Sequence, residues 1–115
     1  MPQKRNQELH KLQRYELEKW REDWAGLYIL SSAADVSGPI ASGLFLLRDT
    51  TNGELSLVLY HIASTPVIVS QTGSEFVTGA PGASQIQVKD LTTRIGFRAG
   101  SGRNGAKLRV TTVYS

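Results

Sequence analysis

The pattern of hydrophobic and polar residues changes near position 25. From residue 6 to residue 24, apolar residues recur among charged ones, and the segment contains neither Gly nor Pro. This composition and spacing predict an amphipathic α-helix over residues 6–24, with Asn6 as its N-cap and Gly26 as a stop. At ~1.5 Å per residue, the helix would be about 28 Å long.

After Gly26 the chain consists of short apolar or alternating runs, separated by Gly, Ser, Thr, Asn and Pro. Runs of this kind predict strands joined by turns, and their spacing favours an antiparallel β-sandwich or a jelly-roll-like barrel. We therefore predict a mainly β protein, with an N-terminal α-helix in residues 1–25 and a β-sandwich domain in residues 26–115. The eight expected strands are Leu27–Ser32, Gly43–Arg48, Glu54–Ile62, Pro66–Gln71, Glu75–Thr78, Gln85–Lys89, Thr92–Arg98 and Lys107–Tyr114.

Most of these strands alternate, which indicates one buried and one solvated face. Ile86 and Val88, for example, share a face that excludes the polar residues between and beside them. Two runs, Leu44–Leu47 and Leu57–Tyr60, are apolar on both faces. They should be central strands, or their second face should be covered by the helix or by another subunit. A tight turn at Thr51-Asn52-Gly53-Glu54 should join them as a hairpin.

The helix has one face that suits an interface. Leu17, Trp20, Trp24 and Leu27 follow the 3-4-3 spacing of coiled-coil a and d positions. One interpretation is an intermolecular helix, either in a short dimeric or trimeric bundle or anchored in a groove of a partner, since Trp is enriched at interfaces. The other is a lone amphipathic helix folded onto its own β-domain. The sequence leaves both open.

Composition limits the class of protein. A chain of 115 residues is one domain plus an appendage. A β-domain of this size exposes much of its surface, so oligomerisation would be a natural source of further buried area. The N-terminus is too polar for a signal peptide, and no apolar run approaches the ~18–20 residues of a membrane span.

Candidate chemistry is sparse. The chain has no Cys, which excludes disulfides, thiolate zinc sites and a Cys nucleophile. Its two histidines, His10 and His61, have no metal-ligand companion at a useful spacing. No nucleophile elbow, catalytic carboxylate pair or phosphate-binding loop is evident, and the Gly-rich segments GAPGAS and GSGRNG are typical of β-turns. We expect no enzyme, no cofactor and no metal site.

Charge is unevenly distributed, although the net charge is only +3. Residues 89–115 contain six Lys and Arg residues but a single acid, Asp90. If the faces of the last two strands coincide, the cations there form a basic patch. Such a patch is either a solvated outer face or a binding surface for an acidic protein, an anionic glycan or, least favoured, nucleic acid, because outward aromatics for base stacking are missing. The patch would comprise Arg94, Arg98, Arg103, Lys107 and Arg109.

The order of these elements resembles a known class of domain. The run AGLYILSSAADVSGPIASGLFLLRDTTNGELSLVLYHIASTPVIVSQTGSEFV is followed by RIGFRAGSGRNGAKLRVTTVYS. A GLY-hydrophobic strand, an apolar hairpin, a V-x-x-x-S-x-x-G-x-x-F turn and a final basic segment resemble the small β-domains of tailed-bacteriophage virion proteins. Such domains occur in capsid decoration (cement) proteins, head fibres and tail-fibre or spike pieces, often as trimers behind an N-terminal helix. The resemblance covers about residues 25–115.

This resemblance implies a non-enzymatic virion structural protein, made in the host cytoplasm and assembled as a homotrimer. The short chain, from an initial Met to an expected final strand, favours a capsid decoration or head-fibre protein that docks on the major capsid protein or an adjoining virion protein. The alternative is a carbohydrate- or receptor-binding module of a phage fibre. That module would need exposed aromatic residues, for which Tyr28, Tyr60 and Tyr114 are the candidates.

Overall fold

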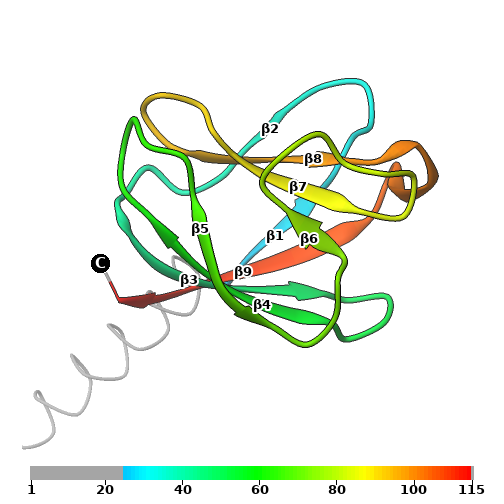
Figure 1. Ribbon diagram of the computed structural model, residues 1–115, viewed down its shortest axis with the longest axis horizontal. Helices are drawn as coiled ribbons and strands as arrows, with labels where there is room; N and C mark the ends of the chain where they lie inside the picture. The colour runs from blue at the N-terminus through cyan, green and yellow to red at the C-terminus, as the bar shows by residue number, and fades with distance from the viewer. Residues whose placement is uncertain (1–24, 115) are drawn as a thin grey trace, which may run out of the picture.

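Two β-sheets face each other across a common core in the computed structural model, which describes residues 25–114 (Figure 1). A five-stranded sheet has the order β1-β9-β3-β4-β5, and a four-stranded sheet has the order β2-β8-β7-β6. All strand pairs are antiparallel except β6 and β7. The elements are β1 (Ala25–Ile29), β2 (Val36–Ser37), β3 (Gly43–Asp49), β4 (Leu55–Tyr60), β5 (Val67–Gln71), β6 (Phe76–Val77), β7 (Ile86–Asp90), β8 (Ile95–Ala99), the 3₁₀ turn η1 (Ser101–Arg103) and β9 (Lys107–Tyr114).

The prediction of a mainly β, antiparallel-rich domain is confirmed. Each of the eight expected strands has a counterpart in the structure, within a few residues at either end. The strand that the sequence did not reveal, β2, pairs only two residues with β8, too few to produce an alternating pattern. The expected helix over residues 6–24 lies outside the described residues.

The core comes from one face of each sheet. Alternate residues of β3 and β4 point into it, and Phe45, Leu47 and Val58 have no exposed surface. The opposite sheet contributes Ile86 and Val88, as their alternation predicted. Because both sheets bury a continuous apolar face, the hydrophobic effect holds the layers together. The buried apolar residues are Leu30, Phe45, Leu47, Val58, Tyr60, Phe76, Ile86, Val88, Ile95, Phe97, Ala99, Leu108 and Val110.

The expected hairpin between β3 and β4 is confirmed. Gly53 has φ +76°, a conformation that costs little only for glycine. Its N–H donates to the carbonyl oxygen of Asp49 at 2.8 Å, and the side-chain oxygen of Asn52 accepts from the N–H of Glu54 at 2.9 Å. These bonds fix the register in which Leu46 lies opposite Leu57.

One polar contact joins the two sheets inside the core. The hydroxyl group of Tyr60, on β4, donates to the Asp90 carboxylate, on β7, at 2.5 Å. Burial and this contact with Asp90 raise the pKa of Tyr60 to about 12. The same oxygen of Asp90, Oδ1, also accepts a hydrogen bond from the backbone N–H of Thr92 at 2.9 Å, which shapes the turn into β8. Tyr60 therefore joins the two sheets at one end of the sandwich, and its side chain is not available at the surface.

Candidate functional site

The outer side of the five-stranded sheet is apolar over most of its area. Strand register places Leu44, Leu46 and their neighbours on β4 and β5 on the side away from the core. Antiparallel sheets with one solvated face normally carry polar residues there. We define the outer apolar face as Leu27, Leu44, Leu46, Leu55, Leu57, Leu59, Val67, Val69 and Val113.

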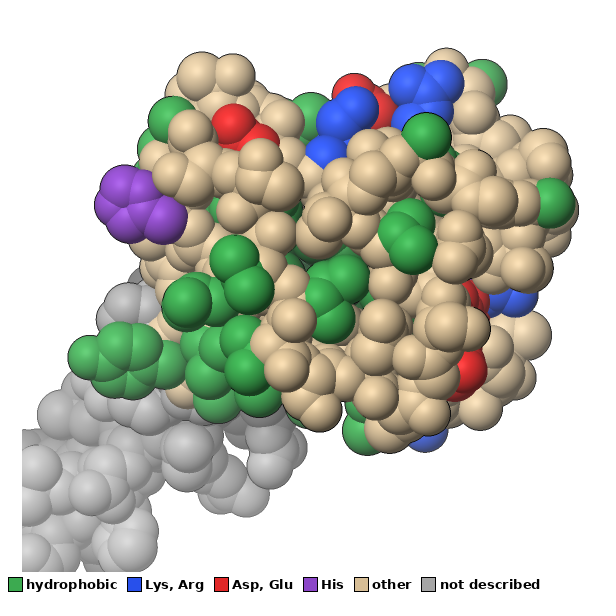
Figure 2. All heavy atoms as spheres, in the orientation of Figure 1, with side chains coloured by type: hydrophobic (Ala, Val, Ile, Leu, Met, Phe, Trp, Pro, Cys, Tyr) green, Lys and Arg blue, Asp and Glu red, His purple; other side chains and the backbone are tan. Residues whose placement is uncertain are grey.

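Several side chains of this face are strongly exposed. Leu59 is 50% exposed, Val67 56% and Val113 48%. Figure 2 shows hydrophobic side chains gathered over one end of β3, β4 and β5. A contiguous exposed apolar surface on a small domain is typical of a protein-binding site, because single scattered apolar residues are the usual pattern on monomers.

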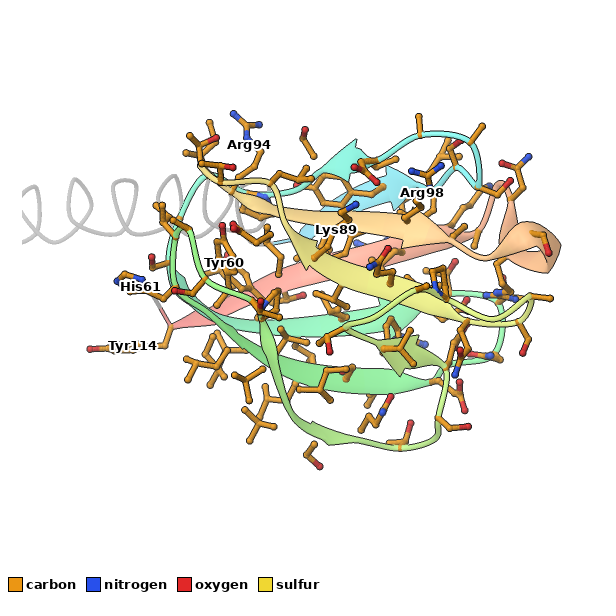
Figure 3. All side chains as sticks on the ribbon, turned by 45° about the horizontal axis from the view of Figure 1, so that its top comes forward. Tyr60, His61, Lys89, Arg94, Arg98 and Tyr114 are labelled. Atoms are coloured by element: carbon orange, nitrogen blue, oxygen red, sulfur yellow. The ribbon has the colours of Figure 1, made fainter. Side chains whose placement is uncertain are left out.

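Two hollows mark the outer apolar face. One, of about 360 Å³, lies between Leu44, Leu59 and Tyr114 and includes His61 on its rim. The other, of about 240 Å³, is lined by apolar residues of β3 and β4 and by Ser70 and its neighbours on β5. Figure 3 shows Tyr114 extending away from the domain at the end of β9, close to His61. A flat sheet with two shallow apolar depressions suits the side chains of another polypeptide better than an enclosed small molecule.

The other end of the same sheet carries three cations, which we call the basic row: Arg48, Lys107 and Arg109. Arg48 and Arg109 are direct cross-strand neighbours, and Lys107 lies opposite Ile29 on the edge strand β1. Within residues 25–114, none of the three forms an ion pair. The outer side of the sheet is therefore apolar at one end and basic at the other, and no acid of residues 25–114 pairs with the basic row.

The five predicted cations do not form one basic patch. Strands β8 and β9 belong to different sheets, so Arg94 and Arg98 lie on one layer while Lys107 and Arg109 lie on the other. Figure 3 shows Arg94 and Arg98 on the four-stranded layer, well away from Tyr114. The predicted patch requires the faces of the last two strands to coincide, and they do not, because the 3₁₀ turn η1 carries the chain from one sheet to the other.

Ion pairing further separates these cations. The Asp35 carboxylate accepts from Lys89 Nζ at 3.1 Å and from Arg98 at 3.4 Å, which makes a local cluster on the four-stranded sheet. The exposure of all three side chains means that water screens these pairs. Arg103 differs from these residues because most of its side chain is buried.

Arg103 is the centre of a buried charge cluster at the end of the sandwich opposite Tyr60. Its guanidinium group is in ion pairs with Asp49, which has no exposed surface, and with Glu75 Oε1 at 2.9 Å. Asn52 donates to the second oxygen of Glu75 at 3.3 Å. A polar pocket of about 320 Å³ opens beside Glu54 and Glu75. The cluster ties η1 to the β3–β4 hairpin and to the segment that precedes β6.

One carboxyl group of this cluster, that of Glu75, has an unusually high pKa. Burial, together with the neighbouring carboxyl group of Glu54, raises the pKa of Glu75 to about 7. Sequence reasoning did not single out these residues. A signal was present, since Asp49 continues the inward-facing series Phe45, Leu47, and an acid at a core position requires a buried partner.

Of the predicted interface set, Leu17, Trp20 and Trp24 lie outside the described residues. Leu27 lies in strand β1, half-exposed on the outer apolar face. It is therefore not the fourth position of a helical seam, because strand pairing with β9 already begins at Ala25. It still belongs to an apolar surface that is open to a partner.

The described residues contain no group of three or more His, Cys, Asp or Glu side chains arranged to hold a metal ion. In the same part of the chain, there is no helix with the length and hydropathy of a membrane span. Comparison of the chain with protein-family models, with curated proteins and with solved structures found no match.

Proposed function

We propose that this chain is a non-enzymatic bacteriophage virion structural protein that works by docking to other protein surfaces. The proposed form is a homotrimeric capsid decoration or head-fibre protein on the major capsid protein or an adjoining virion protein. Its N-terminal helix and the jelly-roll-like character of its β-domain are parts of the same proposal, as is its location in the virion.

The outer apolar face carries this proposal. Its residues come from all five strands of one sheet, and it remains open although the other face of that sheet is packed in the core. A surface of this kind gains its stabilisation only when a partner covers it, at about 25 cal/mol for each Å² of apolar area removed from water. The class of partner, a virion protein, follows from the sequence resemblance.

The alternative, a carbohydrate- or receptor-binding module, has less support among the tyrosines that it would need. Tyr60 is buried, and Tyr28 packs against Phe97 with ring centroids 5.9 Å apart. Among the tyrosines of residues 25–114, only Tyr114 is strongly exposed, at 76%. Sugar rings usually stack on aromatic faces held by a rigid element, whereas Tyr114 is the last described residue of its strand.

Two measurements test the proposed function. Mass spectrometry of density-gradient-purified phage particles from the source culture should find this protein at a fixed ratio to the major capsid protein. Light scattering of the purified full chain should give the mass of a homotrimer. Absence from particles would overturn the virion role, and a monomeric mass would overturn the trimer. Specific hits on a glycan array, lost in Tyr114→Ala, would favour the alternative.

A further inference from the structure

We propose that the outer apolar face binds the N-terminal segment, residues 1–24, of a neighbouring copy of this chain. The inference rests on the proposed assembly role and names the occupant of the same surface. It follows from the charge on the sheet, the sequence of the segment, and the place where the segment joins the domain.

Charge argues against direct association of two such faces. Arg48, Arg109 and Lys107 share the sheet surface with the apolar residues, and no acid within the described residues pairs with them. If two identical faces packed fully against each other, these cations would lose water without gaining an anion. A buried charge needs a partner of opposite sign, so the occupant should carry acids as well as apolar side chains.

The N-terminal segment has both. Its second half, residues 13–24, contains the large apolar residues Leu17, Trp20 and Trp24. The four acids there, Glu16, Glu18, Glu22 and Asp23, outnumber the three cations, Arg14, Lys19 and Arg21, although residues 1–24 as a whole carry one more cation than acids. An amphipathic helix can therefore present apolar side chains to the sheet while acids on its flank reach the basic row. Burial of one or two Trp side chains in shallow apolar hollows is a common way to anchor a helix on a protein surface.

The dimensions agree. Neighbouring strands lie about 4.8 Å apart, so the outermost strands of a five-stranded sheet are separated by roughly 19 Å. The expected helix would be about 28 Å long, which is more than that width. It is therefore long enough to cross the whole sheet with its last turns in contact with the strands. The two hollows follow one another along β3 and β4, one towards Tyr114 of β9 and the other towards Ser70 of β5, so a helix that crosses the sheet diagonally can reach both.

The junction at Ala25 favours a neighbouring copy over the same chain. Strand β1 runs from Ala25, opposite Thr111, to Ile29, opposite Lys107, so the preceding residues leave the sheet at its apolar end. The sequence predicts helix through Trp24, and β1 begins at the next residue. Connections that turn a helix back across a sheet need about 2–6 residues. No residue remains for such a connection between the expected helix and β1. We therefore expect the segment to reach a neighbouring copy and not to fold back onto its own domain.

Because the chain has no native Cys, single cysteines can test this arrangement in the full-length protein. One copy carries Lys19→Cys, which keeps every acid of the segment. The other carries Ser70→Cys, at an exposed position of β5 beside the second hollow. The two are mixed, treated with a short bismaleimide, and separated by mass. The matched control replaces Ser70→Cys by Thr93→Cys, which is exposed at the turn between β7 and β8.

The expected result is a mixed adduct of the Lys19→Cys and Ser70→Cys copies, absent with Thr93→Cys, in a sample whose mass by light scattering exceeds that of a monomer. Adducts solely between two Lys19→Cys copies in an oligomeric sample would overturn the inference and leave the assembly role standing, because the segments then bundle with one another. A double variant, with Lys19→Cys and Ser70→Cys in the same chain, is treated in the same way. If the sample is monomeric and only this double variant is cross-linked, within one chain, the inference and the assembly role are both overturned. A monomeric sample with no adduct would also overturn both.

Discussion

Arg48 on β3 and Arg109 on β9 are direct cross-strand neighbours on the outer side of the five-stranded sheet, and no acid of the described residues pairs with either. Like charges directly opposite each other in a sheet are destabilising by a few tenths of a kcal/mol to about 1 kcal/mol. We attribute the tolerance of this pair to the acids in residues 16–23 of the partner segment.

This relationship predicts that one substitution has opposite effects on stability and on assembly. In Arg109→Gln, the free energy of unfolding of the domain should rise by about 0.5 kcal/mol, because the repulsion with Arg48 is removed. Self-association should weaken several-fold, because an attraction to the acids of the N-terminal segment is lost. Urea denaturation at low concentration and sedimentation velocity at high concentration measure the two effects separately.

The control for that experiment is Arg94→Gln, which removes a cation from the other layer. Its self-association should equal that of the unmodified chain. If Arg109→Gln associates as strongly as Arg94→Gln at both low and high salt, the basic row has no part in assembly.

Residues on the two faces of the five-stranded sheet should respond differently to substitution. Leu47→Ala removes a side chain with no exposed surface and should lower the free energy of unfolding by about 2–5 kcal/mol. Leu59→Ser removes a half-exposed side chain from the outer apolar face and should cost less than about 1 kcal/mol in the dilute domain. Its self-association should nevertheless fall at least tenfold, as measured by light scattering over a concentration series. A Leu59→Ser variant that unfolds as readily as Leu47→Ala would mean that this face is part of the domain's own core.

Much of this fold could be predicted from the local pattern of residues. Alternation at Ile86 and Val88 gave both the strand and the side that is buried, since side chains alternate across a sheet. The Asn52-Gly53 pair indicated the hairpin, because a positive φ is required there. The double-sided apolar runs Leu44–Leu47 and Leu57–Tyr60 indicated central strands with a second face to cover. The structure places β3 and β4 as neighbours within the larger sheet, with that second face open.

The pairing of strands could not be obtained in the same way. Alternation on Ile95–Arg98 and on Leu108–Val110 describes each strand alone, and nothing in it states that η1 separates them into different sheets. The predicted basic patch was wrong for this reason. Arg103 illustrates a second limit, because a cation in a Gly-rich loop has the sequence character of a solvated side chain. Its burial depends on Asp49 and Glu75, which are distant in the sequence.

Arg103 should be one of the residues most sensitive to substitution. Arg103→Ala leaves the Asp49 carboxylate, which has no exposed surface, without its cation. Removing one partner of a buried ion pair typically costs about 3–5 kcal/mol. The double variant Arg103→Ala/Asp49→Ala, which removes both charges, should recover part of that loss in chemical denaturation. Equal stability of the single and double variants would show that the pair is not coupled.

The carboxyl pair Glu54 and Glu75 predicts how stability depends on pH. The pKa of Glu75 is about 7 in the folded protein, against 4.5 for an ordinary Glu, because of burial and the adjacent Glu54. The folded state therefore binds the proton more tightly than the unfolded state. The stability that this proton provides is present below pH 4.5 and is lost as the pH rises through 7.

Glu54→Gln removes one cause of the shift, so the pKa of Glu75 should fall towards its ordinary value. If the change is about one pKa unit, stability at pH 8 rises by about 1.4 kcal/mol, which corresponds to roughly 6–11 °C in melting temperature for a domain of this size. Thermal melts between pH 4 and pH 8 should show a shallower decline for Glu54→Gln than for the unmodified chain. Asp35→Asn, which removes a carboxylate at the surface of the other sheet, should keep the original slope. An unchanged slope in Glu54→Gln would mean that Glu54 does not raise the pKa of Glu75.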